Sequence, residues 1–136
     1  MEPNTLSVTL EVVRHGTGLY AQLRFSNPGK LPFALERSLS GEDVPAGRAL
    51  FEVVDENGAE VPFIGMSGKR DAPEFPDDYV VVQPGAELRT IYPFDKEYAF
   101  PTTGKRYRIR YDVVNTLPDE KGLAFLTSNP AGFTYP

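Results

Sequence analysis

This chain contains no cysteine and only one histidine, His15. Disulfide bonds, thiolate metal sites and a cysteine nucleophile are therefore excluded. Zinc prefers nitrogen and sulfur ligands, and the chain offers too few of them. The fold must rest on a hydrophobic core, and a chain of 136 residues buries roughly two thirds of its unfolded surface, which is enough to form one.

Long apolar runs are also missing. No segment approaches the roughly 18 apolar residues that a membrane-spanning helix needs, so we predict no membrane insertion. Residues 1–10 lack the basic start and apolar block of a signal peptide. We expect a cytoplasmic protein if Met1 is the native start, and a periplasmic or secreted one if a signal peptide was removed. The net charge of -5 disfavours nucleic acid as the main partner.

Proline and glycine, in contrast, are abundant, with 13 and 12 residues. They separate short apolar runs, which is typical of an all-β protein with many turns. The clearest run spans 104–114, where apolar and charged residues alternate. This pattern predicts a strand with one buried and one solvated face. Its inward positions are Tyr107, Ile109, Tyr111 and Val113, and its outward positions are Arg108, Arg110 and Asp112.

Other apolar runs predict further short strands, at 6–12, 19–25, 33–37, 50–55, 60–64, 79–82, 87–92 and 123–126. The first two form a hairpin with a loop of about three to five residues. Asn57-Gly58 predicts a second hairpin, although Pro62 places its return strand at a sheet edge or a strand end. The run at 79–82 is apolar almost throughout, which predicts a central strand. Residues 95–100 are expected to form one helical turn.

Two packed antiparallel sheets account best for these strands. The predicted fold class is therefore all-β, an immunoglobulin-like antiparallel β-sandwich of about seven to nine strands. An open or closed β-barrel is the alternative. Tyr107, soon after the turn residue Gly104, is similar to the tyrosine corner of immunoglobulin-like sandwiches, with a spacing one residue longer than the commonest form. We expect a single domain over residues 1–128 and a C-terminal tail over 129–136.

A family resemblance rests on several segments that occur in a recognisable order, roughly within residues 50–114. They are Val61 to Arg70, Tyr79 to Val82 followed by Pro84-Gly85, Tyr98 to Phe100, and Gly104 to Tyr111. The series resembles the non-catalytic β-sandwich domain that precedes the catalytic domain of deuterolysin-type (aspzincin, peptidyl-lysine) metallopeptidases. Its late part is also similar to the intracellular proteinase inhibitors of bacilli. Both resemblances imply an immunoglobulin-like sandwich that acts on or beside a protease.

The peptidase activity does not carry over with this resemblance. An aspzincin catalytic domain needs a His-Glu-x-x-His helix to place two imidazoles on one metal ion, and this chain has a single histidine. A lone histidine in a Gly-flanked turn, such as His15, is far more often a turn residue than a ligand or a base. The sequence contains no nucleophile elbow, phosphate loop or dinucleotide fingerprint. We therefore predict no enzyme, no cofactor and no metal site.

The main candidate site is the segment 65–78, the longest stretch without periodicity. Phe75 lies between two prolines, which stiffen the loop and lower the entropy lost on binding. An exposed aromatic ring supplies contact area to a partner; the competing interpretation is that the ring folds back and caps the sandwich. The carboxylates of the loop suit calcium by type but match no calcium-loop spacing. The predicted partner-binding residues are Lys69, Arg70, Phe75, Asp77 and Asp78.

The outward arginines of the 104–114 run offer an alternative binding face. Arg108 and Arg110 could receive an acidic partner. The basic residues that could extend this strip are Lys105, Arg106, Arg24 and Arg89. The opposing interpretation is a solvated sheet face whose arginines pair with Glu or Asp across strands.

These observations favour a non-catalytic protein-binding module, associated with a protease as an inhibitor or an accessory domain. The alternative is a structural or adhesive cell-surface module with no protease role. A third hypothesis, a small hydrolase or metal-dependent enzyme, requires a carboxylate cluster that only the folded chain can reveal. The expected partner is a protein, with a protease as the first candidate, and the sequence leaves the oligomeric state open.

Overall fold

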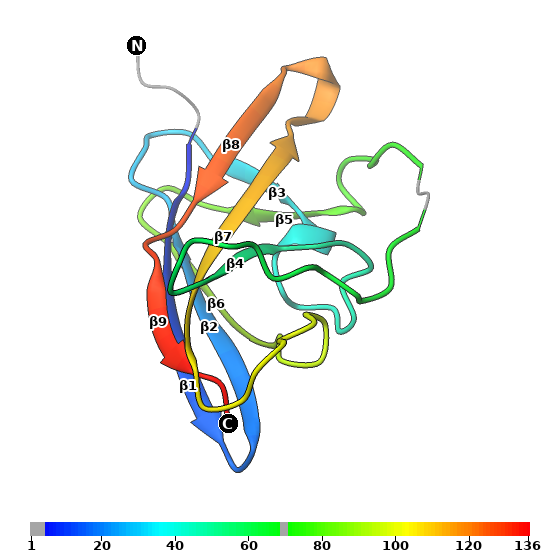
Figure 1. Cartoon of the computed structure of the whole chain (residues 1–136). Coiled ribbons are helices and arrows are strands. Elements are labelled where there is room, and N and C mark those ends of the chain that lie inside the picture. The colour runs from blue at the N-terminus through cyan, green and yellow to red at the C-terminus, as the bar shows by residue number, and fades with distance from the viewer. Residues whose placement is uncertain (1–4, 69–70) are drawn as a thin grey trace.

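The computed structural model describes residues 5–68 and 71–136, and its chain is all-β, as predicted (Figure 1). The strands are β1 (Ser7–His15), β2 (Gly18–Ser26), β3 (Phe33–Glu36), β4 (Phe51–Asp55), β5 (Tyr79–Val82), β6 (Glu87–Pro93), β7 (Arg106–Thr116), β8 (Leu123–Thr127) and β9 (Ala131–Thr134). Two short 3-10 helices, η1 (Arg37–Leu39) and η2 (Pro118–Glu120), lie between strands. In the part of the chain that the structure describes, no helix has the length and apolar character needed to cross a membrane.

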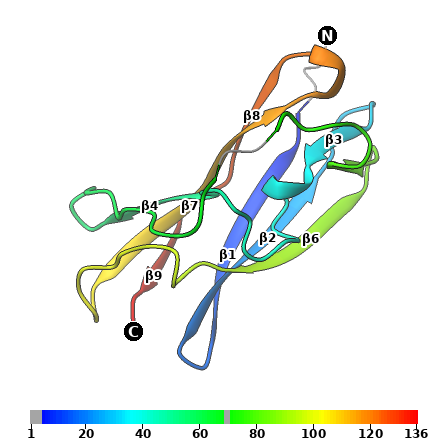
Figure 2. The same ribbon diagram turned by 90° about the vertical axis from the view of Figure 1, so that its right-hand side faces the viewer.

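Two antiparallel sheets form the layers of a β-sandwich (Figure 2). One sheet contains β1, β2 and β6 in that order. In the other, β7 pairs with β4 on one side and with β8 and β9 on the other. Phe25 from the first sheet meets Tyr111 from the second edge to face, with ring centroids 5.5 Å apart. The strands β3 and β5 form a separate two-stranded pair.

The long strand β7 follows the predicted alternation. Tyr107, Ile109 and Tyr111 are buried in the core, whereas Arg108 is exposed. The Tyr107 hydroxyl donates a hydrogen bond at 3.0 Å to the carbonyl of Thr102, a few residues upstream. This hydrogen bond ties the start of β7 to the loop that enters it, and its geometry is similar to that of a tyrosine corner.

A buried asparagine holds the point where the first sheet continues into the β3–β5 pair. Asn27 follows β2, and its backbone donates to Ala86 at 3.2 Å and accepts from Gly85 at 2.9 Å. Its side-chain amide donates to the carbonyls of Leu31 and Val82, at 2.8 and 2.9 Å. Buried carbonyls need hydrogen-bond partners, and the Asn27 side chain is the donor for those of Leu31 and Val82. The backbone ladder can therefore stop at this corner without leaving these carbonyls unpaired.

Two further asparagines join strands that share no ladder. Asn115 is fully buried on β7; it accepts from the Glu36 amide at 2.8 Å and donates to the Ala34 carbonyl at 3.1 Å. Asn129, between β8 and β9, forms the same kind of pair with both backbone groups of Leu10 on β1, at 2.9 and 3.0 Å. Each asparagine side chain therefore makes the two hydrogen bonds that the backbone of a neighbouring strand would otherwise make.

The first hairpin is tighter than predicted. His15 pairs with Gly18, so the loop contains only Gly16 and Thr17 rather than about three to five residues. Gly16 has a φ of 63°. A two-residue loop that matches the twist of its strands needs such a conformation at its first position, and glycine adopts it without strain.

The return strand predicted at 60–64 does not form. Only an isolated bridge between Val54 and Glu60 follows the Asn-Gly turn. Pro62 has no N–H to donate to a ladder, and its carbonyl instead accepts from the Ala99 amide at 2.9 Å. The segment therefore leaves β4 and crosses to the chain before β7.

Three other predictions also differ from the structure. β5 is not central, because within the described residues it pairs only with β3, and Val81 is 40% exposed. The segment 129–136 is not a free tail, since it contains β9, whose Phe133 stacks on Tyr107 at a centroid distance of 6.0 Å. Residues 95–100 form no helix and enter a turn instead.

Candidate protein-binding site

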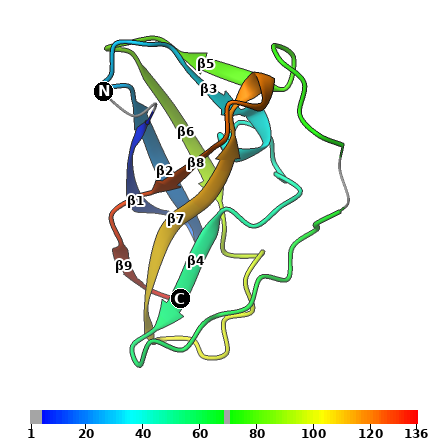
Figure 3. The same cartoon turned by 90° about the horizontal axis from the view of Figure 1, so that it is seen from above.

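Residues 65–68 and 71–78 belong to the long loop between β4 and β5 and lie on the opposite side of the molecule from β9 (Figure 3). Two of its predicted contact residues, Lys69 and Arg70, lie outside the described residues. The chain is anchored just before the loop, where the ring of Phe63 packs edge to face against Tyr98 at 5.5 Å. The loop therefore departs from a fixed point.

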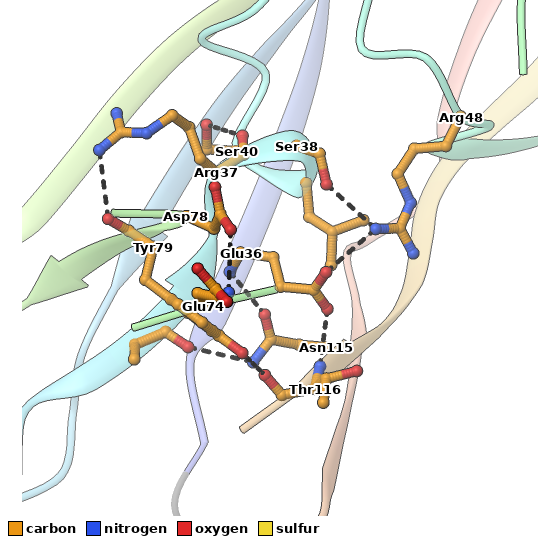
Figure 4. A network of polar contacts seen from close by, with 12 residues as sticks. Glu36, Arg37, Ser38, Ser40, Arg48, Glu74, Asp78, Tyr79, Asn115 and Thr116 are labelled. Atoms are coloured by element: carbon orange, nitrogen blue, oxygen red, sulfur yellow. Dashed lines mark hydrogen bonds and ion pairs between the residues drawn. The ribbon is translucent and has the colours of Figure 1, made fainter. Parts of the chain in front are cut away.

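The second half of the loop is a closed turn that is bonded to the body of the fold (Figure 4). The Asp78 amide donates to the Glu74 carbonyl at 2.8 Å, and the Glu74 amide donates back to Oδ2 of Asp78 at 2.9 Å. The Asp78 carbonyl accepts from the Arg37 amide at 2.8 Å. Asp78 therefore has a structural role in the turn, besides the partner contact that the sequence predicts.

Phe75 lies within this turn and is 51% exposed. One side of its ring contacts Tyr79, with ring centroids 5.8 Å apart. The ring thus neither projects freely nor caps the sandwich, and about half of its surface is open to a partner. Asp77 is exposed nearby. Ile64, just before the loop, is 62% exposed, and Met66, near its start, is 75% exposed.

A buried carboxylate beneath the turn connects several elements (Figure 4). Glu36, at the end of β3, accepts from the Arg48 guanidinium at 3.1 Å and from the Thr116 amide at 2.7 Å. The Tyr79 hydroxyl donates to the Thr116 carbonyl at 2.6 Å. Burial raises the pKa of Tyr79, and the negative charge of Glu36 raises it further. This network fixes the first residue of β5 and with it the turn that carries Phe75.

The sequence analysis did not single out Glu36 or Arg48. Leu35 points into the core, so alternation predicts an exposed Glu36. Glu36 is buried because Arg48 and the end of β7 bond to it, 12 and 80 positions away. No local pattern indicates such contacts. Asn115, in contrast, occupies an inward position of β7, which marks it as a buried polar residue.

The two arginines of the alternative binding face, Arg108 and Arg110, differ in burial and in ion pairing. Arg110 is partly buried and pairs with Glu52 on β4 at 2.9 Å and with Asp112 at 3.4 Å. Arg108 is exposed and forms no ion pair within the described residues. Of these two arginines, only Arg110 therefore shows the cross-strand pairing that is expected of a solvated sheet face.

Arg24 and Arg89 do not extend this face. They lie opposite each other on β2 and β6, and Glu87 pairs with both, at 2.7 and 3.3 Å. Leu23 and Phe25 flank Arg24 and point into the core, so Arg24 points out of the other sheet. The two groups of arginines therefore lie on opposite outer faces of the sandwich.

The remaining titratable groups lie away from the turn that carries Phe75, although Glu97 adjoins Gly65 at the start of the loop. His15 is exposed at the end of β1. Within residues 5–68 and 71–136, no three His, Asp or Glu side chains lie close enough together to hold a metal ion. The Glu97 carboxylate accepts from the Tyr92 hydroxyl at 2.9 and 3.1 Å. Burial raises the pKa of Glu97 and raises that of Tyr92 to about 12.

In comparisons with known proteins, no family model matches this sequence, and no curated protein matches it either. The assignment of a role therefore rests on the residues and their geometry.

Proposed function

We propose that this chain is a non-catalytic protein-binding module whose contact runs through residues 65–78 and centres on Phe75. The observation that supports the proposal is a half-exposed aromatic ring on a turn whose backbone is hydrogen-bonded before any contact. A turn that is already ordered loses little conformational entropy on binding. Buried aromatic anchors contribute much of the energy of protein interfaces, and loops on rigid β scaffolds commonly carry binding.

A protease is the partner class that we propose first. The sequence resembles two groups of protease-associated β-sandwich proteins, and the proposed role is that of an inhibitor or an accessory domain.

The proposal can be tested by capture followed by affinity measurement. Wild-type protein and the variants Phe75→Ala and Ile91→Ala are immobilised and exposed to lysate of the source organism, and retained proteins are identified by mass spectrometry. Ile91 is a matched control, because it is 53% exposed but lies on β6. We expect Phe75→Ala to weaken binding of the purified partner at least about tenfold, which corresponds to about 1.4 kcal/mol, and Ile91→Ala to leave it unchanged.

An affinity that is unchanged in Phe75→Ala would remove the loop as the contact site. The protease role is tested separately, by measuring whether the protein inhibits serine and metalloproteases or forms a complex with them. A partner that is not a protease, bound through Phe75, would keep the binding module and reject the protease.

A further inference from the structure

The strand β8 lies at the end of its sheet and has β7 on one side (Figure 1). In an antiparallel ladder, the backbone groups of alternate residues point toward opposite neighbours. The amide of Ser128, the residue after β8, donates to the Tyr111 carbonyl of β7 at 3.0 Å. In the same register Leu126 and Ala124 also direct their backbone groups toward β7. The amides and carbonyls that point away from β7 therefore belong to Leu123, Phe125 and Thr127.

These outward backbone groups have no hydrogen-bond partner in the part of the chain that the structure describes. There β8 pairs with β7 alone, and the backbone of Leu123, Phe125 and Thr127 forms no hydrogen bond outside that ladder. A row of unpaired amides and carbonyls at a sheet edge is a template for pairing with another strand. Within the described residues, the edge of β8 is therefore open to an added strand.

Side chains close other edges of the fold. The Tyr98 hydroxyl bonds both backbone groups of Phe51 on β4, at 2.9 and 3.1 Å. Asn115 bonds the outer side of β3, and Asn129 does the same for β1. Proteins also protect sheet edges with charged residues or proline, and β8, with the sequence Leu-Ala-Phe-Leu-Thr, contains neither. The chain thus leaves β8 available for pairing.

The side chains beside this open edge are apolar. Phe125 is 72% exposed and Leu123 is 58% exposed, and both point to the same outer face, as alternate residues of a strand do. Val114 lies opposite Phe125 on β7 and is 39% exposed. The residues with unpaired backbone groups therefore also carry the exposed apolar side chains. One added strand would bond the backbone groups and cover the side chains together.

We propose that β8 pairs antiparallel with β8 of a second copy of this chain, related to the first by a two-fold axis. Leu123 faces Phe125 of the second copy, and Phe125 faces Leu123 of the second copy. Because both residues point their backbone groups outward, each unpaired amide meets an unpaired carbonyl. The apolar side chains of each facing pair lie together on the outer face.

A second copy suits this edge because the edge is complementary to itself. A two-fold contact requires that each residue of a facing pair also occurs in the reverse order, and the pairing of Leu123 with Phe125 meets this condition. No charged side chain of β8 would face its like across the pair. The Thr127 end stays outside the contact, because Asn129 is bonded to Leu10 and holds β1 beside that end.

The strength of this dimer follows from its size. The contact covers a few side chains, far less than the roughly 800 Å² per partner of a standard interface. We therefore expect a weak dimer that forms at high protein concentration. Salt should not weaken it, because the contact contains no ion pair and each copy carries a net charge of -5.

Sedimentation equilibrium over a range of protein concentrations tests the proposal. We expect the average mass to rise from that of the monomer toward twice that value as the concentration approaches about 1 mM. Phe125→Lys places a charge at the edge and is expected to weaken dimerisation at least about tenfold. Ile91→Lys is the matched control, since Ile91 is 53% exposed on β6 and the same change there should have no effect. Circular dichroism checks that both variants fold.

Leu123→Pro tests the backbone bonds separately from the side chains. Proline is tolerated at the first residue of a strand, and Leu123 is the first residue of β8. The substitution removes an amide that has no partner among the described residues of the monomer. We therefore expect a folded monomer whose dimerisation is weakened at least about tenfold.

A chain that stays monomeric up to about 1 mM would overturn the proposal. Equal losses in Phe125→Lys and Ile91→Lys would also overturn it, because they would reduce the effect to overall charge. A monomeric chain that binds a labelled synthetic peptide of alternating valine and threonine through Phe125 would assign the edge to a strand of a different protein and reject the second copy. Phe75→Ala is expected to leave dimerisation unchanged, which keeps this test independent of the proposed loop contact.

Discussion

The two bridging asparagines allow a direct measurement of what burial adds to the same pair of hydrogen bonds. Asn115 and Asn129 each accept from one backbone amide and donate to one backbone carbonyl of another strand, at distances between 2.8 and 3.1 Å. Asn129 has one more bond, a donation at 3.3 Å to the carbonyl of the adjacent Pro130. Asn115 is fully buried, whereas Asn129 is exposed. Replacing each of them with alanine removes the same chemistry from two different environments.

The two variants are expected to lose different amounts of stability, because water can replace the side-chain amide of the exposed Asn129 but not that of the buried Asn115. In Asn115→Ala the Glu36 amide and the Ala34 carbonyl lose their partners in or near the core. An unsatisfied buried group such as the Glu36 amide costs about 1–3 kcal/mol, and the Ala34 carbonyl, whose bond is only partly buried, adds about 1 kcal/mol. We therefore expect a total loss of about 2–4 kcal/mol in the free energy of unfolding. In Asn129→Ala water can bond the Leu10 backbone, and the expected loss is about 1 kcal/mol or less.

Urea unfolding followed by circular dichroism measures both losses, and equal m-values would show that the comparison is of like states. The difference of about 2 kcal/mol corresponds to a melting temperature roughly 8 °C lower for Asn115→Ala than for Asn129→Ala. Equal losses in the two variants, or a loss below about 1 kcal/mol in Asn115→Ala, would refute the reasoning. In that case the interior at Asn115 must admit water or relax.

Four further predictions concern the core, the corner, one carboxylate and metal dependence. Ile109 is 0% exposed, so Ile109→Ala should cost about 2–5 kcal/mol in urea unfolding; a loss below about 1 kcal/mol would mean that this side chain contributes little to the core. Tyr107→Phe removes the 3.0 Å bond to Thr102 and should cost about 1 kcal/mol, and an unchanged midpoint would show that the corner bond is neutral. Burial holds the pKa of Glu97 above its usual 4.5, so the folded state binds that proton more tightly than the unfolded state does, and stability is lost as the pH rises through the raised pKa. Glu97→Gln should therefore gain stability relative to wild type as the pH rises to about 7, and a gain that is the same in acid and at neutrality would contradict this. Addition of EDTA should leave the melting temperature unchanged, since the chain has one histidine and no cysteine, and stoichiometric zinc after dialysis would contradict that expectation.

The candidate loop was predictable as a segment, because a long stretch without periodicity cannot join a ladder. The exposure and the hydrogen bonds of the side chains in this loop were not predictable. The half-exposure of Phe75 depends on its contact with Tyr79, and the hydroxyl of Tyr79 is bonded to the end of β7. The structural role of Asp78 likewise depends on a bond from Arg37, far away in the sequence. Exposure in a loop is set by such distant partners, which leave no mark on the local pattern.

For the arginine face, too, the local pattern predicted one part and distant partners decided the rest. Alternation along 104–114 correctly placed Arg108 and Arg110 on one side of a strand, because side-chain direction in a strand depends only on position. It could not distinguish them from each other. Only the register with β4 brings Glu52 to Arg110, and only the pairing of β7 with β8 sets Phe125 beside Val114 on the same face.

The sequence by itself determined the all-β character, the buried face of β7 and the first hairpin, since these follow from local alternation and turn residues. The tertiary structure decided which strands are central and which lie at an edge. The apolar run of β5 pairs only with β3 among the described strands, and the short β9 forms because β7 offers it a free edge. Strand propensity is a local property, but a strand's neighbours are chosen by pairing and packing across the whole chain.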